Sequence, residues 1–130
     1  MATQNYATQL QSSVERSTPA LLALSEAESA RHPAPRKWSP REVLGHLIDS
    51  ASHNHQRFVR AQFQDDLVFQ GYEQDAWVRV QQYQESPWVE LVTLWRTFNL
   101  HIARVMAAVP EPVRTRVHLR HNLDEIAWQS

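Results

Sequence analysis

The stretch that decides the fold is KWSPREVLGHLIDSA, residues 37–51. Ser39, Pro40 and Glu42 stand in the order of a capping box, in which an N-cap hydroxyl and a Glu three residues later satisfy free backbone N–H groups, with proline at the first helical position. We therefore expect a helix to begin at Ser39 and to continue to about Gln64. Its apolar residues share one broad face at helical spacing, and we expect them to be buried: Val43, Leu44, Leu47, Ile48, Ala51, Phe58 and Val59.

The segment before this stretch predicts one long helix over about residues 4–30. Pro19 introduces a kink or a local break, because proline removes a backbone hydrogen bond from a helix interior. Residues 31–37 contain two prolines and form the connecting loop.

The segment after it predicts two further helices. A short helix over about residues 73–83 follows the helix breaker Gly71. Ser86 and Pro87 then repeat the cap-plus-proline start and open a third long helix, which ends near Pro110. Residues 122–129 could add one or two helical turns. Alternating strand patterns closed by Asn-Gly turns are absent, so the chain is predicted to be all-α.

Length and composition describe an ordinary globular protein. The 130 residues fit a single domain, residues 1–130, and a chain without Cys must build any metal site from His and carboxylate side chains. A formal charge of −1 lacks the basic excess that nucleic-acid binding requires. No basic leader with an apolar stretch and no uniformly apolar run of about 18 residues is present. We therefore expect a cytoplasmic protein with no membrane partner.

Three long amphipathic helices do not close a bundle core, which normally needs a fourth. The sequence stops at Ser130 before a fourth long helix has formed. We therefore expect a four-helix bundle that is incomplete at its C-terminus. The apolar groove left open by that gap could drive homodimerisation.

Candidate functional side chains lie on the helix that begins at Ser39. A polar stripe flanks its apolar face at spacings of four, three and four residues, with Asp49 slightly further round: His46, Ser50, His53 and Arg57. Neutral imidazole is the commonest metal ligand and His46 lies beside the seam, so His46 is the best candidate ligand. The alternative is an interfacial His held by a hydrogen bond, because a metal site needs about three or four convergent ligands.

The other histidines fit a metal site less well. His53 and His55 are two positions apart and point about 200° away from each other, so they cannot hold one ion, and we expect His55 to lie in or near the core. His101 could approach the same cleft as His46 if its helix packs antiparallel to the first, and the alternative is a solvated flank residue. His118 and His121 lie near Arg116 and Arg120, which disfavour a divalent cation.

Several stretches of the sequence resemble a known family. Residues 37–51, continued by Asn54, Arg57 and Phe58, resemble the second helix of DinB/YfiT-like proteins. Three further stretches are similar to the middle and the third helix of that family: residues 71–77, 88–95 and 99–101. Together these stretches are spread over residues 37–101.

The resemblance implies a four-helix bundle of the up-down-down-up type that binds a divalent metal, often nickel or zinc, through three His at one end of the core. His46 matches the first of these ligands. The other two come in the family from a His-x-x-x-His pair on the fourth helix, and this sequence contains no such pair. One imidazole alone would bind a divalent ion too weakly to hold it in a cell.

The function implied by the resemblance is that of a metal-dependent enzyme acting on a small molecule. Water or a thiolate on the open metal positions would be the nucleophile of a hydrolase or of a thiol S-transferase. The alternative is a catalytically silent helical domain that forms homodimers through its exposed apolar groove.

Overall fold

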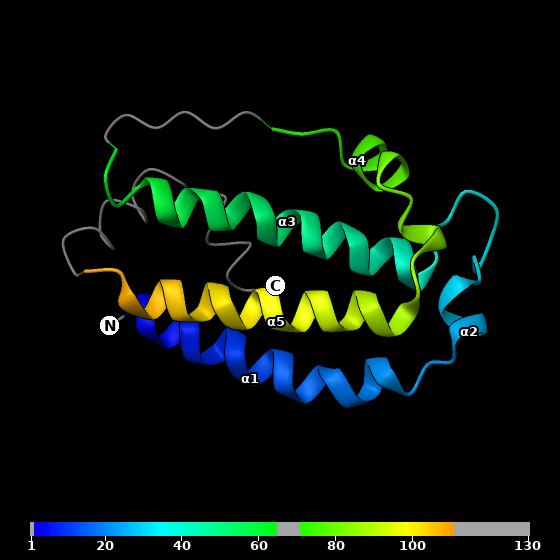
Figure 1. Cartoon of the computed structure of the whole chain (residues 1–130), viewed down its shortest axis with the longest axis horizontal. Helices are drawn as coiled ribbons and strands as arrows, with labels where there is room; N and C mark the ends of the chain where they lie inside the picture. The colour runs from blue at the N-terminus through cyan, green and yellow to red at the C-terminus, as the bar shows by residue number, and fades with distance from the viewer. Residues whose placement is uncertain (1, 65–70, 111–130) are drawn as a thin grey trace.

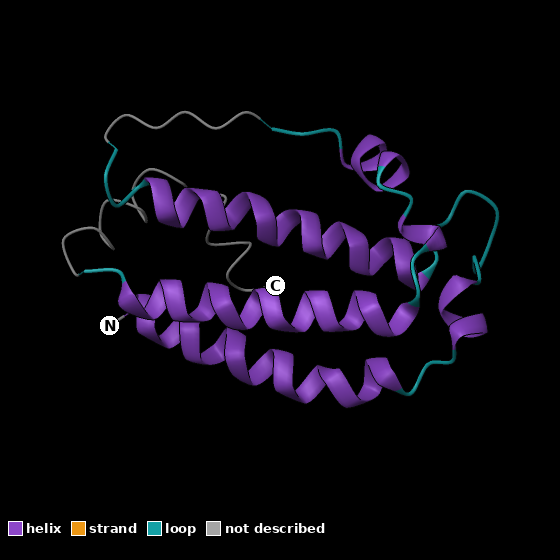
Figure 2. Cartoon of the chain, viewed as in Figure 1, coloured by secondary structure: helices purple, strands orange, loops and turns teal. Residues whose placement is uncertain are grey.

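The computed structural model describes residues 2–64 and 71–110, with side chains described from Tyr6 onward. This part of the chain contains helices and no strand (Figure 2), which confirms the all-α prediction. The elements are α1 (Ala2–Leu22), α2 (Glu26–Ala30), α3 (Pro40–Arg60), α4 (Gln74–Val80), the 3₁₀ turn η1 (Tyr83–Glu85) and α5 (Trp88–Ala108). The expected turns at residues 122–129 and the expected gap at the C-terminus lie outside the described residues. Among the described helices, none is long and apolar enough to cross a membrane.

The three long helices lie side by side, with α5 between α1 and α3 (Figure 1). α1 runs antiparallel to α5, whereas α3 and α5 run in the same direction. Two parallel neighbours cannot be joined by a short turn, so a crossover segment separates α3 from α5, and its described residues 71–87 carry α4 and η1. This order of directions gives the first three helices of an up-down-down-up bundle.

The first predicted helix is interrupted, but not at Pro19. Pro19 lies inside α1, which continues to Leu22. The break comes at residues 23–25, because Ser25 and Glu28 form a capping box that opens α2: the Ser25 hydroxyl accepts from Glu28 N at 3.0 Å and the Glu28 carboxylate from Ser25 N at 2.9 Å. The prediction of one helix over residues 4–30 was therefore wrong.

The start of α3 is confirmed. Ser39 is the N-cap, its hydroxyl accepts from Glu42 N at 3.3 Å, and Glu42 accepts from Ser39 N at 3.1 Å. The Ser39 side chain is fully buried, and its hydroxyl is satisfied there because it also donates to the Gln84 side chain, at 2.5 Å. The capping box thus also fastens η1 to the first turn of α3. α3 ends at Arg60, a turn before the predicted end at Gln64.

The start of α5 is capped from a distance. Ser86 was expected to cap this helix, and that expectation was wrong: the N-cap is Pro87, and no side chain of the cap itself bonds to the helix. The Glu26 carboxylate of α2 takes this role, accepting from Trp88 N at 2.8 Å and from Val89 N at 3.4 Å. A negative charge at this position suits the positive end of the helix dipole.

Arg41 ties the same end of the bundle together. All three of its guanidinium nitrogens donate: Nε to the Ser29 hydroxyl at 3.0 Å, Nη1 to Gln84 O at 3.1 Å, and Nη2 to the Glu26 carboxylate at 2.9 Å. The Arg41 side chain is only 12% exposed. Charge-assisted bonds that are partly shielded from water are among the stronger ones, so α2, α3 and η1 are held as one unit.

The core forms two clusters along the bundle. One joins α1, α3 and α5 around Phe58, Ile102 and Met106, and the other joins α3, η1 and α5 around Leu44 and Trp88. The predicted burial of the α3 face was too wide: Val43 is 44% and Leu47 41% exposed, and Val59 is half-buried. α5 covers the part of α3 that carries Leu44, Ile48 and Ala51, and Val43 and Leu47 lie at the edge of that contact.

The crossover is seated on α3 by Tyr83. Gly45 is buried beneath the Tyr83 ring, and a Cβ at this glycine would lie 2.1 Å from the ring carbon Cδ2. One turn further along α3, Asp49 accepts a 2.7 Å hydrogen bond from the Tyr83 hydroxyl. The aromatic ring therefore lies along the helix surface with one end on a glycine and the other on a carboxylate.

We expect Gly45→Ala to lower the free energy of unfolding by about 2 kcal/mol or more, because overpacking against the buried Tyr83 ring outweighs the roughly 1 kcal/mol gained in helix propensity. Urea denaturation measures the change. Gly71→Ala is the matched control, since an added Cβ there meets nothing within 4 Å. Equal denaturation midpoints for the two variants would contradict the close approach of Tyr83 to α3.

Candidate functional site

All four residues of the predicted polar stripe lie on α3, and the middle of the stripe is covered. His46, Ser50, His53 and Arg57 are all half-buried along α3. Tyr72 lies over the middle of the stripe: its hydroxyl is 3.1 Å from the Ser50 hydroxyl, and its ring stacks on His53 with centroids 3.9 Å apart. The segment that precedes α4 therefore shields the middle of the stripe from solvent.

His53 is fixed in orientation and in tautomer. Its Nδ1 lies 2.8 Å from Asp49 O, and because a carbonyl oxygen can only accept, Nδ1 carries the proton. The Trp77 ring meets the imidazole edge-on at 4.7 Å. Neutral His53 therefore offers Nε2 as its acceptor, held between two aromatic rings.

His46 has a buried nitrogen without a partner. Its ring is half-buried against Trp38, with centroids 5.2 Å apart, and its Nδ1 makes no hydrogen bond. Buried polar atoms in proteins almost always have a partner, so an orphaned one calls for an explanation. Within residues 2–64 and 71–110, no three His, Asp or Glu side chains come close enough together to hold a metal ion.

His101 does not approach His46. Its ring centroid lies 5.5 Å from that of His55, near the C-terminal ends of α3 and α5. Such an approach required antiparallel packing, and because α5 runs parallel to α3, the late position of His101 in its helix meets the late part of α3. His55 lies between His101 and Phe98, whose ring is 5.4 Å away. Burial, and then the nearby charge of His101, lower the pKa of His55.

Asp49 is the most buried member of the candidate set. It is 2% exposed, and its Oδ1 accepts from the Tyr83 hydroxyl at 2.7 Å and from Gln81 Nε2 at 2.8 Å. Burial and the bond to Asp49 raise the pKa of Tyr83 well above its usual value. Its second oxygen, Oδ2, is buried without a hydrogen-bond partner. Helical spacing predicted Asp49 only beside the stripe, although its spacing of four from Gly45 marks the surface that receives Tyr83.

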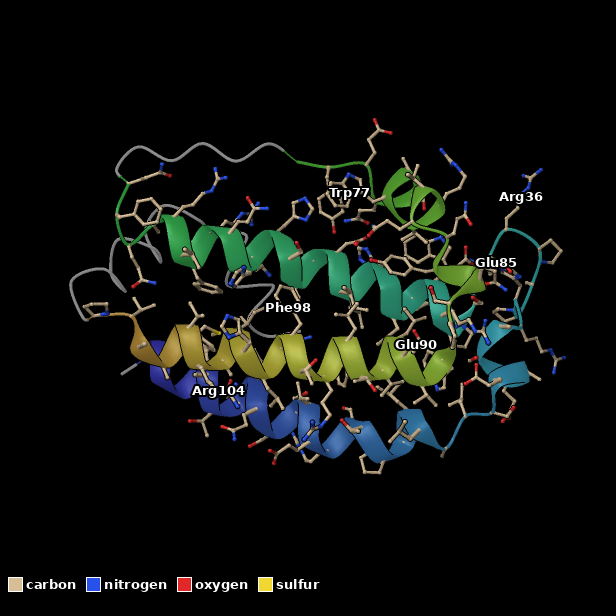
Figure 3. The ribbon with its side chains drawn as sticks, viewed as in Figure 1. Arg36, Trp77, Glu85, Glu90, Phe98 and Arg104 are labelled. Atoms are coloured by element: carbon tan, nitrogen blue, oxygen red, sulfur yellow. The ribbon has the colours of Figure 1, made fainter. Side chains whose placement is uncertain are left out.

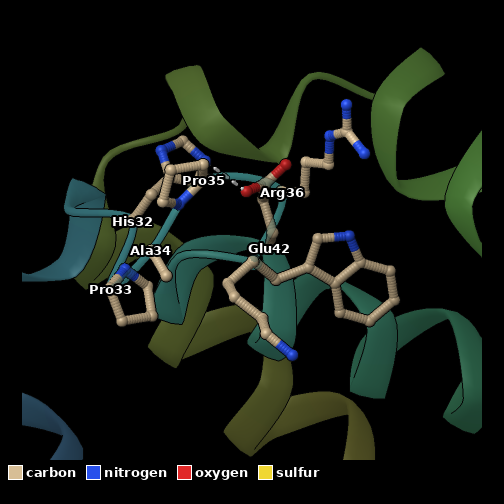
Figure 4. A pocket seen from close by; sticks show the side chains of 8 residues that line it. His32, Pro33, Ala34, Pro35, Arg36 and Glu42 are labelled. Atoms are coloured by element: carbon tan, nitrogen blue, oxygen red, sulfur yellow. Dashed lines mark hydrogen bonds and ion pairs between the residues drawn. The ribbon is translucent and has the colours of Figure 1, made fainter.

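A cavity of about 630 Å³ lies in the loop between α2 and α3 (Figure 4). Two of its lining side chains already contact each other, since His32 Nε2 and Glu42 Oε1 are 2.7 Å apart. A second cavity of about 470 Å³ lies between α3, α4 and α5, with Asp49 in its wall. His46 lines neither of them.

The chain matches a known protein family. The family model described as the DinB superfamily matches residues 9–125, which include most of α1 and all of α3 and α5. This match confirms the resemblance seen in the sequence. No curated protein and no solved structure gives a significant match.

The lowered pKa of His55 predicts a stability change with pH. Its value in the unfolded chain is near 6.5, so below that pH the unfolded state binds more protons than the native state, and the free energy of unfolding falls until the pH drops below the native pKa. We expect His55→Gln to lose less stability than the wild type between about pH 7.5 and about pH 5.

Urea denaturation at the two pH values measures this difference. His101→Gln removes only the charge effect and keeps the burial of His55, so its pH dependence should fall between those of the wild type and His55→Gln. An unchanged pH dependence in His55→Gln would show that this imidazole does not titrate differently on folding.

Proposed function

Because the chain belongs to the DinB superfamily, we propose that it binds a divalent metal ion, nickel or zinc, through His46 and acts on a small molecule as a metal-dependent hydrolase or thiol-dependent transferase. The observation that supports this proposal is the buried Nδ1 of His46, which has no hydrogen-bond partner. A metal ion is one partner that would satisfy this lone pair.

The described residues supply one ligand and not a complete site. A stable site needs about three or four ligands, and no second His or carboxylate group in residues 2–64 and 71–110 completes one. Further ligands would come from chain outside the described ranges or from a second copy. A metal ion with open positions lowers the pKa of bound water or thiol, which is the chemistry that hydrolases and thiol-dependent transferases use.

Metal content tests the proposal. After incubation with nickel or zinc and dialysis, elemental analysis should find close to one ion per chain in the wild type and almost none in His46→Ala, because that substitution removes the ligand. His101→Ala is the matched control, since it removes an exposed imidazole that lies against His55 and away from His46.

A double variant, His118→Ala with His121→Ala, locates the missing ligands. Loss of metal in this variant identifies His118, His121 or both as the missing ligands. Retention of metal points to a second copy of the chain or to another residue. A wild type without metal, or equal metal in His46→Ala and the wild type, contradicts the proposal.

A second candidate function is a catalytically silent domain that self-associates. Val43 and Leu47, one turn apart on α3, are exposed by 44% and 41%. Such a pair lies on one helix face, and a two-fold axis would bring the same face of a second chain onto it.

Light scattering after size-exclusion chromatography distinguishes this candidate. A self-associating domain should have the mass of a dimer, and Leu47→Lys should reduce it to the mass of one chain, because a charge in an apolar interface is costly. Val80→Lys, at a 73% exposed position on α4, is the control and should leave the dimer intact. A wild type with the mass of a single chain excludes this candidate.

A further inference from the structure

The cavity between α3, α4 and α5 has a wall of aromatic and apolar side chains around one charged group. Trp77 of α4, Tyr83 of η1 and Phe98 of α5 all line it, together with Leu94 and the carboxylate of Asp49. Figure 3 places Trp77 beside α4 and Phe98 between α3 and α5. Its volume of about 470 Å³ is in the range of cavities that bind small molecules.

The charge of Asp49 is not balanced by the protein around it. The carboxylate is 2% exposed, it forms no ion pair with a described residue, and its Oδ2 has no hydrogen-bond partner. Among residues 2–64 and 71–110, no basic side chain lines the cavity. A buried carboxylate is costly unless it is paired, so this cavity favours a positively charged hydrogen-bond donor.

The Gln81 side chain contacts this carboxylate and can be displaced from it by a ligand. Gln81 is exposed, its Nε2 donates to Asp49 Oδ1 at 2.8 Å and to Trp77 O at 3.1 Å, and its Oε1 lies 3.0 Å from the Tyr83 hydroxyl oxygen. The exposed amide can exchange these bonds for bonds to water at little cost. A ligand that displaces it gains an acceptor that is buried and negatively charged.

The aromatic side chains add to the selectivity for a cation. Trp77 is 41% exposed and presents its ring at the cavity, with Phe98 on the side of α5. The negative face of an aromatic ring attracts a cation, and the same rings and Leu94 would bury an attached apolar group.

We propose that this cavity binds a small organic ammonium compound, a protonated amine attached to an apolar group. The ammonium takes the place of the Gln81 amide at Asp49, and the apolar group lies against Trp77, Leu94 and Phe98. This site is independent of the metal proposal, because His46 does not line the cavity.

Benzylamine and its neutral analogue benzyl alcohol test the proposal on the full chain by isothermal titration calorimetry at about neutral pH, where the amine is protonated. We expect the wild type to bind benzylamine at least about tenfold more tightly than benzyl alcohol, a difference of about 1.4 kcal/mol. Asp49→Asn keeps an acceptor for the Tyr83 hydroxyl and removes the charge, and it should abolish this preference. Asp75→Asn removes an exposed carboxylate from α4 and should keep it.

Gln81→Ala separates a binding role of Asp49 from a purely structural one. Without the competing amide, benzylamine should bind severalfold more tightly, an effect that a carboxylate serving only to anchor Tyr83 would not produce. A wild type without preference for the amine overturns the proposal, as does a preference that survives in Asp49→Asn.

Should Asp49→Asn fail to fold, as circular dichroism would show, the decision rests on Gln81→Ala and on the indole N–H signal of Trp77 in nuclear magnetic resonance spectra, assigned with Trp77→Phe. A benzylamine-dependent shift of that signal with tighter binding in Gln81→Ala supports the site. An unshifted signal overturns it.

Discussion

The parallel packing of α3 against α5 is the constraint on which the rest of the structure depends. Two neighbouring helices that run the same way force the chain to return along their full length, and the returning segment has to be fastened somewhere. It is fastened by Tyr83, whose ring lies on Gly45 and whose hydroxyl bonds to Asp49. The same arrangement places α4 beside α3 and thereby creates the cavity in which Asp49 lies.

The end of the bundle at which α3 and α5 begin is held by polar contacts rather than by apolar packing alone. Glu26 caps α5 and pairs with Arg41, while Gln84 accepts from the Ser39 hydroxyl and donates to Ala30 O at 2.7 Å. Because each of these groups has a hydrogen-bond partner, burying them at the capping boxes costs little free energy. The cavity at Asp49 and the ring of His46 differ from this end, because each has a buried atom without a partner.

The candidate site was only partly predictable. Helical spacing placed His46, Ser50 and His53 on one stripe, and the structure confirms that arrangement because spacing along a single helix is a local property. The same reasoning could not find Tyr72 over His53, nor the cavity beside Asp49, since both depend on segments that are distant in sequence. Helical spacing also left open whether His101 approaches His46. The parallel direction of α5 decided this, because it places His101 beside His55.

The sequence by itself determined the helical class and the start of α3, because a capping box satisfies backbone N–H groups with side chains three residues away. It did not determine where α5 is capped, which part of the α3 face is buried or what Asp49 binds. Glu26 lies 62 residues before the amide it caps, and Tyr83 lies 34 residues after the carboxylate it bonds. Only the tertiary structure decided these pairings, because local propensity carries no information about which distant segment will supply the partner of a polar group.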